Sequence, residues 1–126
     1  MPSWYTEQDK EGFKGAWDAL PDYCEAKTNV DEYFYTESRK RGDGKAGGWE
    51  DIDLRPGTLT DDKGRGKVGL GKVGVGKVSR EDVGDVAVRL LEAGGAGGLW
   101  VDLVEGDEEA GEAVERVVKG RITTRA

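Results

Sequence analysis

Side chains that can build a hydrophobic core are scarce in this chain. Leu, Ile, Val and Phe together supply 25 of the 126 residues, and 21 residues are glycine. This apolar content lies near the compositional border of disorder. Four Trp and four Tyr add apolar area, which is enough for one modest core. We therefore expect one weakly stable domain over 21–120, after an irregular segment over 1–20 with at most one short helix, and before a frayed tail over 121–126.

The charged and titratable residues exclude several classes of function. Acidic residues outnumber basic ones by 26 to 19, so the chain lacks the clustered positive field that nucleic-acid phosphates require. The absence of histidine excludes a His-based triad and a zinc site, and a single cysteine, Cys24, excludes an internal disulfide. No stretch has the length of a membrane span, and the first residues contain no apolar core of a secretory signal. We expect a cytoplasmic protein without membrane or nucleic-acid partners.

Apolar spacing and end signals predict three helices. Pro21 is suited to the first turn of a helix over 21–40, and Arg39 to Arg41 complement the negative end of its dipole. Ser79 can cap a second helix that runs to about Ala93, and Asp107 can cap a third over 108–119. The apolar faces are Tyr23, Ala26, Val30, Tyr33 and Phe34 in the first helix, Val83, Val86, Ala87, Leu90 and Leu91 in the second, and Ala110, Ala113, Val114, Val117 and Val118 in the third.

Two extended segments are predicted beside these helices. The first contains Trp49, Ile52 and Leu54 and stops at Pro56, because proline cannot donate to a strand ladder. The second, 99–104, is nearly continuous apolar sequence, as in a strand that is covered on both faces. The glycine-rich stretch between them repeats Gly-Lys-Val three times and predicts a loop with one or two short extended pieces, and 42–48 predicts a surface linker.

The order of elements predicts an α/β fold. Helices that alternate with strands normally cross over between parallel strands. Two parallel strands are too few for a stable sheet, so the pattern matches part of a larger one. We therefore expect an incomplete, Rossmann-like doubly wound sheet, corresponding to a C-terminal half only.

Tyr23 and Lys27 are the residues most suited to catalysis. They lie four apart on the first predicted helix, which brings their Cβ atoms within about 6 Å on one face. A nearby ammonium stabilises a phenolate, and this makes tyrosine usable as a general acid or base. An amphipathic helix with tyrosine inside and lysine in solvent explains the same spacing, so only the surrounding sequence can favour the catalytic interpretation.

Three segments in order supply that context. They are Tyr23-x-x-x-Lys27, then Leu-Arg-Pro-Gly-x-Leu-Thr at 54–60, then Val-Ser-Arg-Glu-Asp-Val at 78–83. Together they resemble the C-terminal half of the atypical short-chain dehydrogenases/reductases of the NmrA-like, NAD(P)-binding type. The resemblance spans roughly 17–119, and it depends on the ordered set because no single motif is specific.

The resemblance implies roles for particular residues. Tyr23 would be the general acid or base toward a carbonyl or hydroxyl group, and Lys27 would lower the pKa of Tyr23 and contact the nicotinamide ribose of NAD or NADP. Pro56 and Gly57 would bring backbone close to the nicotinamide, with Thr58 or Thr60 near its carboxamide. Some members of this type bind the cofactor without catalysis, so the resemblance implies binding more firmly than turnover.

The sequence also departs from this family. Only 22 residues precede Tyr23, which leaves no room for the strand, glycine turn and helix that hold the pyrophosphate. The G-x-G-x-x-G match at 64–69 neither follows a strand directly nor opens a helix, so we assign no phosphate site there. We therefore expect a truncated oxidoreductase-type chain that is weak or inactive alone. The alternative is a non-catalytic binding or assembly module that pairs its exposed sheet edges with itself or with a longer paralogue.

Overall fold

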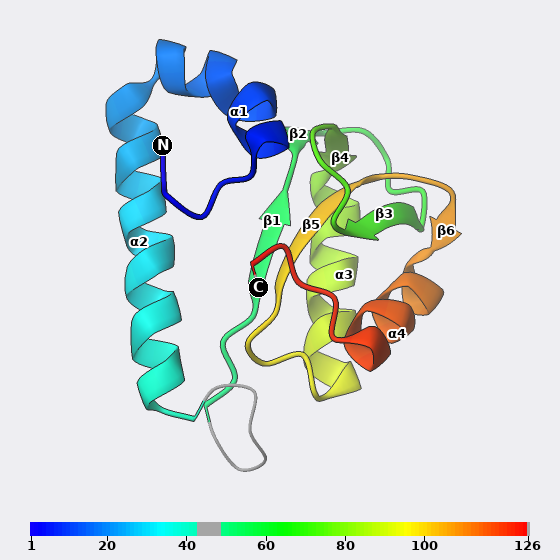
Figure 1. Cartoon of the computed structure of the whole chain (residues 1–126). Coiled ribbons are helices and arrows are strands. Elements are labelled where there is room, and N and C mark those ends of the chain that lie inside the picture. The colour runs from blue at the N-terminus through cyan, green and yellow to red at the C-terminus, as the bar shows by residue number, and fades with distance from the viewer. Residues whose placement is uncertain (43–48, 126) are drawn as a thin grey trace.

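The computed structural model describes residues 1–42 and 49–125, and Figure 1 shows the arrangement of its elements. The predicted linker over 42–48 lies outside the described residues, apart from Gly42. The helices are α1 (Glu7–Ala19), α2 (Pro21–Lys40), α3 (Arg80–Ala93) and α4 (Ala110–Gly120), and the strands are β1 (Asp53–Pro56), β2 (Thr58–Thr60), β3 (Lys67–Gly71), β4 (Lys77–Ser79), β5 (Trp100–Glu105) and β6 (Glu108–Glu109).

The strands form a mixed main sheet and a small second one. In the main sheet the strand order is β1-β5-β3-β6. β1 and β5 are parallel, with Leu54 opposite Val101, whereas β3 is antiparallel to both β5 and β6. β2 and β4 make a separate parallel pair. The predicted α/β class is confirmed, as an incomplete Rossmann-like sheet in which α3 lies in the chain between the parallel strands β1 and β5.

Helices cover both faces of the main sheet (Figure 1). Val101 and Leu103 belong to the core that α3 and α4 complete, and both are fully buried. Trp100 lies on the opposite face, is 3% exposed, and packs edge to face against Tyr35 of α2 at 5.9 Å between ring centroids. The nearly continuous apolar run of β5 therefore reflects burial on both faces, as its sequence predicts.

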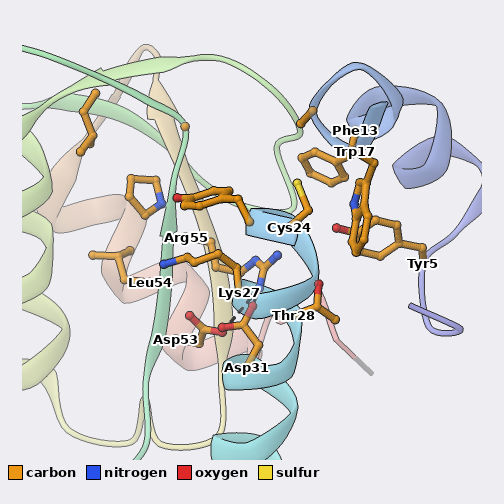
Figure 2. A pocket seen from close by; sticks show the side chains of 15 residues that line it. Tyr5, Phe13, Trp17, Cys24, Lys27, Thr28, Asp31, Asp53, Leu54 and Arg55 are labelled. Atoms are coloured by element: carbon orange, nitrogen blue, oxygen red, sulfur yellow. Dashed lines mark hydrogen bonds and ion pairs between the residues drawn. The ribbon is translucent and has the colours of Figure 1, made fainter. Parts of the chain in front are cut away.

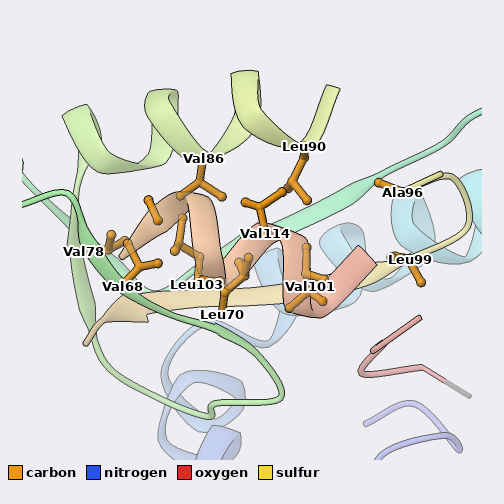
Figure 3. Packing of buried hydrophobic residues seen from close by; sticks show 13 residues of the cluster. Val68, Leu70, Val78, Val86, Leu90, Ala96, Leu99, Val101, Leu103 and Val114 are labelled. Atoms are coloured by element: carbon orange, nitrogen blue, oxygen red, sulfur yellow. The ribbon is translucent and has the colours of Figure 1, made fainter. Parts of the chain in front are cut away.

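One hydrophobic core lies between β5 and the helices α3 and α4 (Figure 3). It reaches β3 and β4, whose apolar residues are the valines and leucine of the Gly-Lys-Val region. The cluster consists of Val68, Leu70, Val78, Val86, Leu90, Ala96, Leu99, Val101, Leu103, Ala110, Ala113, Val114 and Val117.

The helices agree with the sequence in part. α2 and α3 have the predicted bounds, and the Ser79 hydroxyl accepts from the backbone N–H of Asp82 as an N-cap. The third predicted helix starts too early, because Glu108 and Glu109 pair with β3 as β6 and α4 begins only at Ala110, without a side-chain cap. Leu91 was expected on the apolar face of α3, but it is 73% exposed. No described helix is long and apolar enough to cross a membrane.

Both ends of the chain are more ordered than the sequence predicts. Residues 7–19, within the segment expected to be irregular, form α1, which a reciprocal capping box between Thr6 and Asp9 stabilises. Instead of a frayed tail, Thr123 accepts a hydrogen bond from the Trp100 N–H, and the Thr124 N–H donates to the Trp100 carbonyl at 2.8 Å. The division of the chain into 1–20, 21–120 and 121–126 is therefore not marked by a loss of order at either end.

Candidate functional site

A cleft of about 540 Å³ lies between α1, α2 and the end of β1 (Figure 2). Its lining joins an aromatic part with a charged part, a combination typical of small-molecule sites. The carboxyl end of β1 opens into it, which is the end of a parallel strand where α/β proteins bind ligands. Its lining residues are Tyr5, Phe13, Ala16, Trp17, Tyr23, Cys24, Lys27, Thr28, Asp31, Asp53, Leu54, Arg55, Pro56, Gly57 and Leu59.

The structure brings four of the predicted site residues to this cleft. Tyr23 and Lys27 reach it from consecutive turns of α2, and Pro56 and Gly57 reach it from the end of β1. Tyr23 is 59% exposed, and in the described part of the chain its hydroxyl and the Lys27 amine form no hydrogen bond or ion pair. Both groups are therefore available to a ligand, and their chemical roles stay predictions.

Thr58 and Thr60 do not line the cleft. They belong to β2, where Thr58 pairs with Lys77 and Thr60 with Ser79 of β4. The Thr58 N–H donates to the Gly76 carbonyl at 2.9 Å. The backbone pairing of β2 with β4 thus holds both threonines beyond the turn that faces the cleft.

Gly57 is required by the chain itself. A Cβ at this position would lie 2.2 Å from the carbonyl oxygen of Gly76, which is far inside contact distance. The backbone N–H of Gly57 also donates to the Leu103 carbonyl at 2.9 Å. The Pro56-Gly57 turn is therefore held by neighbouring backbone, so its glycine needs no bound ligand to explain it.

Arg55 organises the charged part of the cleft. Its guanidinium lies 3.0 Å from the carboxylate of Asp31 on α2, 3.5 Å from Asp53 and 3.6 Å from Asp102 on β5. Figure 2 shows Asp31, Asp53 and Arg55 grouped beside Lys27. Because one cation faces three carboxylates, the charge within this group is not balanced.

The pKa of Asp53 is raised from 3.8 to about 6. Burial of the carboxyl is the largest cause and the nearby Asp31 carboxylate adds to it, while Arg55 opposes the rise. Burial also raises the pKa of Asp102, against the lowering effect of Arg55. Asp53 therefore changes its charge in a pH range where the acidic residues of unfolded chains are already ionised.

An aromatic cluster on the same face of the sheet positions α2 over β1. The Arg125 guanidinium lies 3.7 Å from the ring centroid of Tyr35 and 5.2 Å from those of Trp4 and Trp100. The Arg125 side chain also pairs with Glu32 of α2. Since both chain ends meet α2 and β5 in this cluster, cation–π stacking and the ion pair hold α2 against the sheet.

The aromatic part of the cleft was not predicted from the sequence. Tyr5, Phe13 and Trp17 line it, and the rings of Tyr5 and Phe13 are 5.5 Å apart. In Figure 2 these side chains gather near Cys24, at the opposite end from Asp53. The Thr6-x-x-Asp9 pattern could have indicated the helix that carries two of these aromatic residues.

The glycine-rich G-x-G-x-x-G stretch lies away from the cleft. The backbone N–H groups of Arg65 and Gly66 both donate at 3.0 Å to the carboxylate of Asp82, at the start of α3. These hydrogen bonds, with the Ser79 hydroxyl, outweigh burial and lower the pKa of Asp82. The backbone donors of this stretch are thus used by a carboxylate of the chain. Among the described residues, no group of three or more acidic or cysteine side chains could hold a metal ion.

Comparisons with known proteins agree with the fold. No protein-family model matches the chain, and a search of curated proteins found no match in sequence. Among solved structures, the chain is similar to the oxidoreductase ylbE from Lactococcus lactis, with a TM-score of 0.68 and 22% sequence identity. The match covers 93% of this chain and 46% of ylbE, so the chain spans about half the length of that neighbour. This likeness shows an α/β fold shared with part of an oxidoreductase.

Proposed function

We propose that the chain is an NAD(P)-binding polypeptide of oxidoreductase ancestry, related to the NmrA-like short-chain dehydrogenases/reductases. One observation carries the proposal: Tyr23, Lys27 and the Pro56-Gly57 turn, which lie up to 34 positions apart in the sequence, line the same cleft. An amphipathic helix would explain the four-residue spacing of the tyrosine and the lysine, but it would not explain why the turn after β1 lines the same cleft. The fold shared with ylbE, an oxidoreductase, supports the same ancestry.

The cleft fits the nicotinamide end of a dinucleotide. When bound, NAD(P) would supply or accept the hydride. Lys27 presents an ammonium that is unpaired in the described part of the chain, and this group can donate to ribose hydroxyls. Tyr23 presents a phenol one helical turn away that can give a proton to a carbonyl oxygen or take one from a hydroxyl. Pro56 and Gly57 line the cleft on the side of β1.

The pyrophosphate end has no comparable site in residues 1–42 and 49–125. No described strand and glycine turn leads into α2, since α1 directly precedes it in the chain. The glycine-rich stretch that could imitate a phosphate loop is bound to Asp82. We therefore expect this chain by itself to recognise the nicotinamide ribose and to gain little from the adenosine diphosphate part.

Binding of two ligands tests the proposal. NADPH and reduced nicotinamide mononucleotide are titrated separately while amide signals of residues around the cleft are followed by NMR. We expect both to bind weakly, with dissociation constants within about threefold of each other, because the contacts to the nicotinamide half dominate. Lys27→Ala should weaken both ligands by about tenfold, the usual effect of losing a charge-assisted hydrogen bond.

Lys40→Ala is the matched control, because Lys40 lies on the same helix but does not line the cleft. It should leave both dissociation constants unchanged. If neither ligand shifts the signals of the cleft, the chain is not a nicotinamide-binding protein. If NADPH binds at micromolar concentration and far more tightly than the mononucleotide, the assignment of only a nicotinamide half-site is wrong.

A further inference from the structure

The side chain of Arg125 lies inside a box of three aromatic rings, which together with Glu32 we call the arginine cage. Its guanidinium carbon lies 3.7 Å from the ring centroid of Tyr35 and 5.2 Å from those of Trp4 and Trp100. The rings of Trp4 and Tyr35 stand nearly at right angles to the Trp100 ring, with interplanar angles of 85° and 89°. The Glu32 carboxylate pairs with the guanidinium, whose side chain is only 15% exposed.

Three separate segments of the fold build the arginine cage. Trp4 precedes α1, and Trp100 begins β5. Glu32 and Tyr35 lie three positions apart on α2, a spacing that places both side chains on one face of the helix. Aromatic faces attract cations, and a guanidinium is planar, so it can stack on a ring while it pairs with a carboxylate. The arrangement therefore has the chemistry of a recognition site for a guanidinium group.

Two other guanidinium groups lie near these rings but do not fill the cage. Arg39 lies 4.6 Å from the Tyr35 ring, and Arg55 lies 5.0 Å and 5.9 Å from the two tryptophan rings. Arg55 is also held by the carboxylates around the cleft. Within residues 1–42 and 49–125, Arg125 alone reaches all three rings. The position that its guanidinium takes is therefore the centre of the cage.

The arm that carries Arg125, residues 123–125, lies outside the hydrophobic core. Figure 1 shows it in red beside β5. The Trp100 N–H donates to the Thr123 hydroxyl at 3.0 Å, and the Thr124 N–H donates to the Trp100 carbonyl at 2.8 Å. Ile122 is the last residue of the described chain that packs against the core. The arm can therefore leave the sheet without exposing the core, which makes its release a local opening.

One residue of the cage has a hydrogen-bond donor that is not used. The indole Nε1 of Trp4 is buried and has no hydrogen-bond partner among the described residues. A buried donor without an acceptor is unfavourable, and the guanidinium of Arg125, which has donors only, cannot satisfy it. An arginine ligand also carries a carbonyl or carboxylate oxygen, the kind of acceptor that this donor lacks. The side chain of Arg125 therefore fills the cage without satisfying every polar group in it.

We propose that the arginine cage is a binding site for the guanidinium group of an arginine from outside the chain, and that Arg125 occupies it as an internal competitor. A tethered side chain acts at an effective concentration on the order of millimolar, so it keeps weakly bound cations out of the cage. An arginine that binds better displaces the arm, and ligand binding and arm release are then one exchange. The proposal does not depend on the proposed nicotinamide site.

Titration of N-acetylarginine amide into the isotope-labelled whole chain tests the exchange by NMR. The side-chain Nε–H signal of Arg125, which three rings shift, should move toward the position of a solvated arginine and reach a plateau. Arg125→Ala empties the cage and should lower the dissociation constant of the same ligand by at least about tenfold, because the internal competitor is gone. Arg39→Ala is the matched control, since Arg39 lies over the Tyr35 ring outside the cage and should leave the dissociation constant unchanged.

Matched ligands test the chemistry of the cage in the Arg125→Ala variant. N-acetylcitrulline amide has the shape of the arginine ligand without its charge and should bind at least about tenfold more weakly. Nα-acetyllysine amide has the charge without the plane and should bind at least about threefold more weakly. Adding Glu32→Gln should weaken the arginine ligand by about tenfold, because the ion pair is lost. Tighter binding of free arginine than of the blocked form would assign the free amino acid as the source, and the reverse would assign an arginine of a peptide.

Three results would overturn the proposal. One is an Arg125→Ala variant that binds arginine no more tightly than the original chain, and another is equal binding of the arginine and citrulline ligands. The third is an Arg125 Nε–H signal of the original chain that does not move at ligand concentrations up to about 0.1 M, well above the effective concentration of the arm. This last measurement decides the matter if amide spectra show that Arg125→Ala does not fold. None of these measurements uses a nucleotide, so their failure is independent of the proposed nicotinamide site.

Discussion

Asp53→Asn should make the protein more stable at neutral pH, and the gain should vanish in acid. Asp53 is a carboxyl whose side chain is 23% exposed, beside Asp31 and only 3.5 Å from Arg55. Its pKa is about 6 in the folded chain, against 3.8 for an ordinary aspartate, chiefly because of burial. A neutral amide of the same size removes the cost of the buried charge, and its oxygen can still accept from Arg55.

The pH difference gives the magnitude and the sign. Between about 3.8 and 6 the folded state holds a proton that the unfolded state has lost, so the free energy of unfolding falls as the pH rises through this range. About two pH units correspond to about 3 kcal/mol, and solvent screening of the Asp31 contribution lowers the expected effect to between about 1.5 and 3 kcal/mol. Asn does not titrate, so its advantage grows from near zero at pH 4 to this value above pH 7.

Urea unfolding followed by tryptophan fluorescence at several pH values measures this difference. The matched control is Asp61→Asn, since the Asp61 side chain is 90% exposed and pairs with Arg80 at the surface. The control should change stability by no more than about 0.5 kcal/mol at any pH. A variant at position 53 that is less stable than the original chain at pH 7.5, or equally affected at pH 4 and 7.5, would refute the assignment of a buried, destabilising charge.

Two further substitutions test what holds the fold. Asp82→Asn should lower the free energy of unfolding by about 3 kcal/mol at pH 7, because the backbone N–H of Arg65 or of Gly66 then faces an amide nitrogen. This loss of stability should shrink in acid, as the pH approaches the lowered pKa of Asp82. Urea titrations of both proteins at pH 7 and pH 3 check this, and a pH-independent loss would contradict it. Leu103→Ala should lower the free energy of unfolding by between about 2 and 5 kcal/mol, because Leu103 is fully buried. Leu91→Ala, at an exposed position, should lower it by less than about 0.5 kcal/mol. Equal losses of stability in thermal unfolding would show that Leu103 is not part of the core.

Most of the fold could be predicted from local patterns. The bounds of α2 and α3 follow from Pro21 and from the Ser79 cap, signals that depend on neighbouring residues only. The start of α4 could not be predicted in this way, because Glu108 and Glu109 are suited to a first helical turn. They are extended instead because β3, about forty residues earlier, offers hydrogen bonds to them.

The candidate site could be predicted only where it follows a motif. Tyr23, Lys27, Pro56 and Gly57 were found because they belong to spaced patterns, and the structure places them around one cleft. The interactions of Asp31 give no local signal, since this residue meets Arg55 only after α2 packs on β1. The threonines of the same motif lie elsewhere because the pairing of β2 with β4, which no local pattern indicates, removes them from the cleft.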